Sequence, residues 1–234
     1  MKNYGITISL TVLLVQCKPH ISEKYIIPYQ DSFNIKIDGN ADNNEWNNSE
    51  SPAFTFPWKN ETDPNTLFYA KMDKNNFYFL FKVKDDDLVI VNSDAESDVA
   101  KGDRVELFFA QDKDLKKPYY CMEMSPNGKV LDYEASFYRK FDHSWNFPQI
   151  HIAASMNDTG YIVEGSIPVQ VLDSLGIYKH GNKHPYLLAG LYRAAFSHSA
   201  DNKIREEWVS WINPETKEPD FHVPSSFGSI VIDQ

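Results

Sequence analysis

Apolar side chains recur at every second position over much of this chain, which is the period of β-strands with one buried face. Within residues 77–84, four of them predict a single row that faces a core: Phe77, Phe79, Phe81 and Val83. The same pattern predicts strands at 67–72, 103–109, 119–124, 129–135, 150–156, 161–167, 186–196, 207–212 and 229–232. Turn residues separate most of these segments, including an Asn127-Gly128 pair that is typical of tight hairpins.

One segment, residues 168–175, predicts a helix instead, because Pro168 stands at its first turn and Gly176 lies just past its end. Roughly ten strands and one short helix are typical of a sandwich. We therefore expect an all-β fold, a two-sheet antiparallel β-sandwich with one short helix. Within residues 103–109 the alternation places Arg104 and Glu106 on the face away from the core.

The composition fits one soluble globular domain, with 234 residues of which 42% are hydrophobic and 24% are charged. A net charge of −10 leaves no basic field for polyphosphate, which argues against nucleic-acid binding and against adhesion to anionic lipid. Aromatic residues reach 14% and glycine only 10 residues, which favours aromatic β-faces over glycine-rich nucleotide loops. A protein of this kind can bind neutral ligands by stacking.

The N-terminus predicts export and a lipid anchor. A mostly apolar run that ends at Cys17 is typical of a signal peptide (1–16) with a lipobox-like cysteine. We expect acylation of Cys17, a lipid-anchored tether over 17–32, and an extracytoplasmic lipoprotein at the outer membrane or cell surface. Gln16 is larger than the residue usual before such a cysteine, so plain secretion is an alternative, as is a buried N-terminal strand. Cys121 is then a lone thiol, expected to be a small buried hydrophobe.

Four segments follow one another along residues 33–234: IDGNADNNEW (37–46), DRVELF (103–108), GYIVEGSIP (160–168) and FHVPSSFG (221–228). Together they resemble the family 9 carbohydrate-binding modules, in the broad sense that includes family-9-like domains of bacterial surface proteins. The resemblance implies one sandwich domain over 33–234 that binds a glycan or oligosaccharide, for polysaccharide capture or catabolism, without catalysis of its own. In sugar-binding members two tryptophans sandwich a terminal sugar unit, and the corresponding positions here look like Ala100 and Phe221.

A sugar-like ligand needs flat rings for its C–H faces and planar polar groups for its hydroxyls. The ligand-binding candidates are Trp58, Arg104, Tyr138, Arg139, Trp145, Arg193, Trp211 and Phe221. Trp208 and Trp211 are three positions apart on one predicted strand and so point to opposite faces; we expect Trp211 to be the exposed one. The arginines either donate paired hydrogen bonds to hydroxyls or a uronate, or form ion pairs with Glu106, Asp142 or Glu123.

Structural roles are the alternative for several of these aromatic residues. Trp58 and Trp145 stand among proline, asparagine and charged neighbours, so they either stack on a ligand or pack at an edge of the sandwich. Trp46 ends the first of the four segments, and we expect it to plug the core. His222 flanks Phe221, and a solvated loop histidine is the expected outcome there.

The acidic loops are candidates for a metal. Calcium prefers six to eight oxygen ligands from carboxylates and carbonyls, and a possible structural calcium site comprises Asp85, Asp87 and Asp94. Family members often bind structural calcium, although no EF-hand spacing is present here. A solvated charged loop is the alternative, and no other cofactor is expected.

Catalysis has little support. A glycosidase needs two carboxylates across a cleft, and the best candidates, Glu106, Glu123 and Glu164, are expected to share one sheet face; salt bridges within the sheet are their structural alternative. Besides glycan binding, two other function classes stay open. One is a surface lipoprotein that binds a protein partner or builds the envelope. The other is a haem module of the DOMON type, with Met122, Met124 and His151 as candidate ligands.

Overall fold

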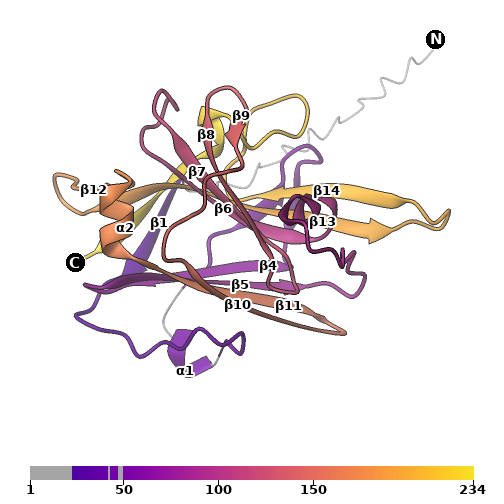
Figure 1. Cartoon of the computed structure of the whole chain (residues 1–234), viewed down its shortest axis with the longest axis horizontal. Helices are drawn as coiled ribbons and strands as arrows, with labels where there is room; N and C mark the ends of the chain where they lie inside the picture. The colour runs from indigo at the N-terminus through magenta and orange to yellow at the C-terminus, as the bar shows by residue number, and fades with distance from the viewer. Residues whose placement is uncertain (1–22, 42, 47–49) are drawn as a thin grey trace, which may run out of the picture.

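The computed structural model describes residues 23–41, 43–46 and 50–234, whose strands form two sheets packed face to face (Figure 1). The small sheet has the strand order β10-β11-β5-β4. Its strands are β4 (Thr66–Met72), β5 (Asn76–Lys84), β10 (His151–Asn157) and β11 (Gly160–Pro168). The predicted all-β sandwich is confirmed.

The large sheet has the main order β3-β2-β14-β13-β6-β7-β8-β9, with β15 and β12 beside β13 and β1 beside β15. Its strands are β1 (Lys24–Pro28), β2 (Phe54–Phe56), β3 (Glu61–Asp63), β6 (Arg104–Ala110), β7 (Tyr119–Met124), β8 (Val130–Ser136), β9 (Lys140–Asp142), β12 (Tyr178–Lys179), β13 (Tyr186–His198), β14 (Ile204–Ser210) and β15 (Gly228–Asp233). The predicted helix is α2 (Val169–Ser174), and the other short helical segments are α1 (Asn43–Trp46), η1 (Glu96–Lys101) and η2 (Pro224–Ser226).

The N-terminal strand β1 corrects the expected tether over 17–32. Its backbone pairs in parallel with β15, whereas the other paired strands are antiparallel. Ile27 has no exposed surface and packs in the core between the sheets. Cys17 and the signal peptide of residues 1–16 lie outside the described residues. No helix in the described ranges is long and apolar enough to cross a membrane.

The core between the sheets is built from the alternating rows that the sequence predicted. Phe77, Phe79 and Phe81 are completely buried there and meet Val105 and Leu107 from the opposite sheet. Because successive side chains of a strand point to opposite faces, Arg104 and Glu106 of β6 lie on the outer face of the large sheet.

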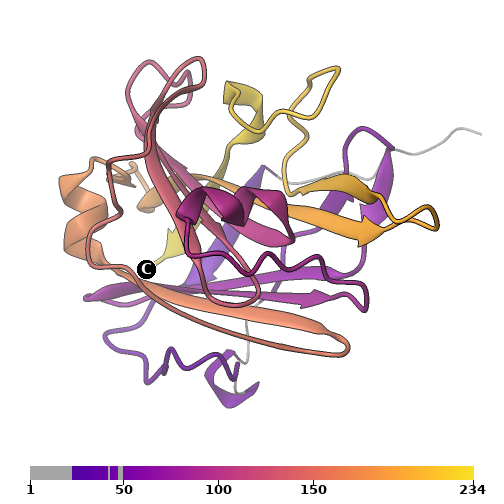
Figure 2. The same cartoon turned by 45° about the vertical axis from the view of Figure 1, so that its right-hand side comes forward.

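That outer face carries a second apolar cluster, which includes Phe108, Tyr192 and the buried thiol of Cys121. The C-terminal segment that contains η2 lies beside the β8–β9 hairpin over this face (Figures 1 and 2). Phe221 and Phe227 of this segment complete the cluster. The large sheet is therefore covered on both sides, and the candidate site lies where the outer cover is open.

Candidate functional site

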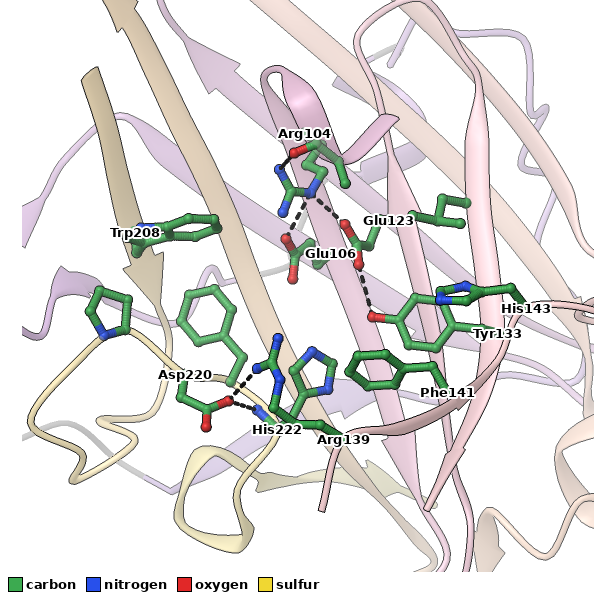
Figure 3. A pocket seen from close by; sticks show the side chains of 14 residues that line it. Arg104, Glu106, Glu123, Tyr133, Arg139, Phe141, His143, Trp208, Asp220 and His222 are labelled. Carbon is green, nitrogen blue, oxygen red and sulfur yellow. Dashed lines mark hydrogen bonds and ion pairs between the residues drawn. The ribbon is translucent and has the colours of Figure 1, made fainter. Parts of the chain in front are cut away.

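A cavity of about 320 Å³ opens on the outer face of the large sheet. Strands β6, β7 and β8 supply its floor, and β9, β14 and the segment after β14 supply its walls (Figure 3). The floor residues are Arg104, Glu106, Glu123 and Tyr133. All four are buried, so their polar groups are held in place before any ligand arrives.

Two carboxylates hold the Arg104 guanidinium at the floor. Glu106 and Glu123 are directly opposite each other on β6 and β7. The Nε atom of Arg104 lies 2.5 Å from Oε2 of Glu123 and 3.0 Å from Oε1 of Glu106. Tyr133 donates its hydroxyl to Oε1 of Glu123 at 2.8 Å. Arg104 thus forms the ion pair within the sheet that was its structural alternative, and this pair lies at the floor of the cavity.

The protonation of this group follows from its burial. Burial together with the charge of Glu123 raises the pKa of Glu106, against the opposing effect of Arg104. Burial disfavours the charged guanidinium, but the two carboxylates raise the pKa of Arg104 above its ordinary value. Arg104 therefore stays cationic, and Glu106 holds its proton to a higher pH than an ordinary glutamate does.

Glu106 keeps one oxygen for a ligand. Among the described residues, Glu106 contacts Arg104 through its Oε1 atom. The other oxygen points into the cavity, away from Arg104 (Figure 3). Because Glu106 is only 2% exposed, that oxygen is a fixed hydrogen-bonding group at the bottom of the site, a donor when the carboxyl is protonated and an acceptor when it is ionised.

Aromatic rings form one wall. Trp208, on β14, lies over the guanidinium of Arg104 at 5.5 Å and meets the ring of Phe221 at 5.9 Å. Phe221 is stacked flat on Tyr192, with ring centroids 4.1 Å apart. The ring of Trp58 also packs against Phe221, with ring centroids 5.8 Å apart, and its indole N–H donates to the carbonyl of Thr216.

The opposite wall consists of Phe141 and His143, whose rings pack against Tyr133 of the floor (Figure 3). His222 lies between the walls with its ring 4.8 Å from Phe141, and its Nδ1 is 3.1 Å from the hydroxyl of Tyr119. Burial, assisted by the charge of Arg139, lowers the pKa of His222 to about 3. The expectation of a solvated loop histidine was wrong, because the C-terminal segment folds inward over the sheet.

Charged residues close the rim. Nη1 of Arg139 lies 2.9 Å from Oδ1 of Asp220, which joins the β8–β9 turn to the C-terminal segment. Tyr138 donates its hydroxyl to the other oxygen of Asp220. The expected partner of Arg139, Asp142, bonds Ser144 instead.

The predicted residues divide into those near the cavity and those elsewhere. Arg104, Arg139 and Phe221 line it, and so does Ala100, the other position implied by the resemblance. Trp58 and Tyr138 each touch a lining residue without lining the cavity.

Three predicted ligand-binding residues lie elsewhere. Trp211 is 1% exposed and packs in the core with Tyr25, so it lies on the opposite face from Trp208 as expected, but it is the buried ring rather than the exposed one. Trp145 packs on Tyr120 at 5.0 Å at the edge of the main core. Arg193 is buried with an ion pair to Asp85 rather than to Glu123.

The predicted calcium ligands are also separated. Asp85 pairs with Arg193, Asp87 contacts Nδ1 of His198 at 2.6 Å, and Asp94 lies 3.6 Å from Nζ of Lys129. Across the described ranges no three His, Cys, Asp or Glu side chains are grouped to hold a metal ion. The three aspartates therefore do not form one ligand set.

The candidate haem ligands do not converge either. Met122 and Met124 are completely buried in the core between the sheets, whereas His151 is exposed on β10 of the small sheet. Packing, rather than axial ligation, accounts for both methionines.

Glu164, expected to share a face with Glu106 and Glu123, lies on the other sheet. It accepts hydrogen bonds from the backbone N–H groups of Gly39 and Ala41, both at 2.9 Å. The indole of Trp46 donates to it at 3.4 Å. Trp46 is buried as expected, but on the outer face of the small sheet rather than between the sheets.

Phe141 and His143 belong to the aromatic cluster at 137–145 that the sequence suggested for a sugar site, whereas Trp208 and Asp220 were not among the predicted site residues. The register of β14 supplies the missing signal for Trp208. That residue pairs with Ala194, and residue 194 has the same parity along β13 as Tyr192, whose side chain points outward. Once the β13–β14 register is known, position 208 is assigned to the outer face.

Solved structures of other proteins share this fold. A candidate carbohydrate-binding protein from Bacteroides uniformis superposes with a TM-score of 0.66 at 16% identity, covering 90% of this chain and 99% of that protein. A family 9 carbohydrate-binding module from Caldicellulosiruptor kristjanssonii in complex with glucose gives a TM-score of 0.58 at 18% identity, with 90% and 95% coverage. At these identities the likeness shows a shared fold.

A further structure of a family 9 module from C. kristjanssonii, in complex with cellotriose, gives 0.56 at 18% identity, covering 89% of this chain and 93% of that module. We found no match among curated proteins. The family described as carbohydrate family 9 binding domain-like matches residues 29–234, beginning with the residue after β1. Because that match spans most of the sequence, the chain belongs to the carbohydrate family 9 binding domain-like family.

Proposed function

We propose that this chain binds one saccharide unit in the cavity on the outer face of the large sheet. One observation carries the proposal: the free carboxylate oxygen of Glu106 and the rings of Trp208 and Phe221 face the same small space. A sugar ring offers apolar C–H faces to the aromatic rings and hydroxyl groups to the buried polar atoms. The family match and the glucose-bound and cellotriose-bound structures of similar fold support this ligand class.

The charges of the cavity favour a neutral sugar. Three carboxyl groups line it, those of Glu106, Glu123 and Asp220, against the two guanidiniums of Arg104 and Arg139. Both arginines already contact carboxylates. A uronate would therefore find no free guanidinium in the cavity, and burying its charge without a cationic partner costs energy.

The same geometry argues for binding without turnover. Glu106 and Glu123 both contact the Nε atom of Arg104. Glycosidase carboxylates instead flank the scissile bond, with room between them for the sugar or a water molecule. The family is one of binding domains, which agrees with the expectation that the chain is not an enzyme.

We place this binding protein outside the cytoplasm, anchored through lipid on Cys17 and serving polysaccharide capture. The apolar N-terminal run that ends at Cys17 supports the anchor. Membrane fractionation of cells that express Cys17→Ala tests it, and protein that stays in the membrane fraction would overturn it.

Calorimetry with glucose, cellotriose and glucuronate tests the binding proposal. Trp208→Ala should weaken binding of the neutral sugars at least about tenfold, and Trp208→Phe should retain more of the affinity because it keeps a ring. Glu106→Gln should weaken the same ligands without unfolding the protein. Affinity that is unchanged in both Trp208→Ala and Glu106→Gln, or no binding of the neutral sugars by the wild type, would refute the proposal.

A further inference from the structure

The cavity accommodates only a small ligand. Its volume of about 320 Å³ lies at the lower end of the roughly 300–1,000 Å³ that ligand pockets span. Given the binding proposed above, on which this inference rests, one saccharide unit fills it. Any further unit of a longer chain must leave through the mouth, past the rim formed by Arg139 and Asp220.

Two exposed aromatic rings stand at that rim. Phe137 is 47% exposed and Tyr138 is 51% exposed, and both lie in the turn between β8 and β9 that also carries Arg139. The other exposed large hydrophobic residues of the described ranges are aliphatic: Ile26, Met156 and Ile204. Exposed aromatic side chains are thus concentrated at the cavity mouth.

The rings are held in position rather than left to rotate freely. The hydroxyl of Tyr138 donates to Asp220, which lines the cavity and also pairs with Arg139. Phe137 packs edge-on against Tyr138, with ring centroids 5.4 Å apart. A ring fixed in this way loses little conformational freedom when a ligand stacks on it.

We infer that Phe137 and Tyr138 form an outer subsite for the second or third unit of a neutral oligosaccharide whose end unit occupies the cavity. A packing role explains neither ring, because about half of each stays in water. The hydroxyl of Tyr138 is bonded to Asp220, so the remaining surface of the ring offers an apolar face to C–H groups. The ligand class of this site is therefore an oligosaccharide rather than a monosaccharide.

Calorimetry with glucose and cellotriose tests the subsite. The wild type should bind cellotriose about tenfold more tightly than glucose, because the outer units add a stacking contact. The double variant Phe137→Ala/Tyr138→Ala should bring that ratio close to one, because the affinity for cellotriose falls far more than the affinity for glucose. Tyr138→Phe keeps the ring and loses only the bond to Asp220, so it should keep most of the ratio.

Met156→Ala is the matched control, because Met156 is 49% exposed and lies on β10 of the other sheet. It should leave both affinities at wild-type values. Equal binding of glucose and cellotriose by the wild type would overturn the outer subsite alone. A cellotriose-to-glucose ratio that stays near tenfold in the double variant would overturn the outer subsite as well. Failure of both sugars to bind would instead refute the proposed function, and this inference with it.

Discussion

Buried carboxylates on the two sheets of this protein have different partners. Glu164 accepts backbone N–H groups and an indole, so it fixes the loop that precedes α1 against the small sheet. Glu106 faces an arginine on one side and a cavity on the other. A buried carboxylate with all its bonds inside the protein has a structural role, whereas one with a free oxygen is available to a ligand.

His222 makes stability depend on pH in a direction that can be measured. Its pKa is about 3 in the folded protein and near 6.5 in an unfolded chain. Between these values the unfolded state binds a proton that the folded state does not, so the free energy of unfolding falls as the pH is lowered through this range. Asp103, whose pKa burial raises to about 6, has the opposite effect, so a comparison with a variant is needed.

We predict that His222→Phe makes the loss of stability on acidification shallower than in the wild type, by up to about 1.4 kcal/mol per pH unit. Urea unfolding at several pH values between about 4 and 6.5 measures this slope. His151→Gln changes an exposed histidine and should leave the slope unaltered. Equal slopes for the wild type and His222→Phe would mean that the imidazole is not buried in neutral form.

Strand alternation allowed some single residues to be placed from the sequence. It correctly put Arg104 and Glu106 on the face away from the core. It also correctly put Trp208 and Trp211 on opposite faces, but the choice of Trp211 as the exposed ring was wrong: Trp211 packs in the core, and Trp208 lines the cavity. Because a tryptophan stands on each face of this segment, its local pattern does not tell which face meets the core.

At the scale of elements, β1 shows how a short strand adds to the core. Its residues alternate between exposed and buried, with Ile26 64% exposed and Ile27 completely buried. The strand pairs with β15, and its buried side chains contact the main core. A flexible tether at the same position would leave both isoleucines in water.

The two neighbouring isoleucines provide a matched test of this strand. Ile27→Ala should lower the free energy of unfolding by about 2–5 kcal/mol, because it removes buried methyl groups and leaves a cavity. Ile26→Ala should change it by less than about 0.5 kcal/mol. Denaturant unfolding of the full chain measures both. Equal, small effects of the two substitutions would mean that residues 24–28 behave as a tether.

Long strands were predictable and short ones were not. β5, β7 and β11 show enough alternation to be recognised, and their observed bounds lie within about one residue of those predicted. β2, β3, β9 and β12 have two or three residues each, which is too short for any period to show. β9 nevertheless brings Phe141 to the cavity, so part of the site depends on elements that leave no sequence pattern.

On the scale of the whole molecule, the cavity joins segments that are distant in sequence. Its lining runs from Ala100 in η1 to His222 near the C-terminus. These residues come together only through the strand order of the large sheet and the packing of the C-terminal segment over its outer face. The family resemblance indicated two lining positions, Ala100 and Phe221, and the sequence also suggested Arg104 and Arg139, while the way these residues meet one another required the complete topology.

The charge of the whole chain gives a last test of the ligand class. The protein carries a net charge of −10, and the range of its field shrinks from about 30 Å at 0.01 M salt to about 8 Å at 0.15 M. A neutral sugar does not respond to that field, so its affinity should change by less than about twofold over this range of salt. An acidic glycan is repelled at low salt and should bind better as salt screens the repulsion. Calorimetry with cellotriose and with glucuronate at the two salt concentrations separates these cases. Cellotriose binding that changes severalfold with salt, or glucuronate binding that strengthens at low salt, would contradict a neutral-sugar site governed by stacking and buried hydrogen bonds.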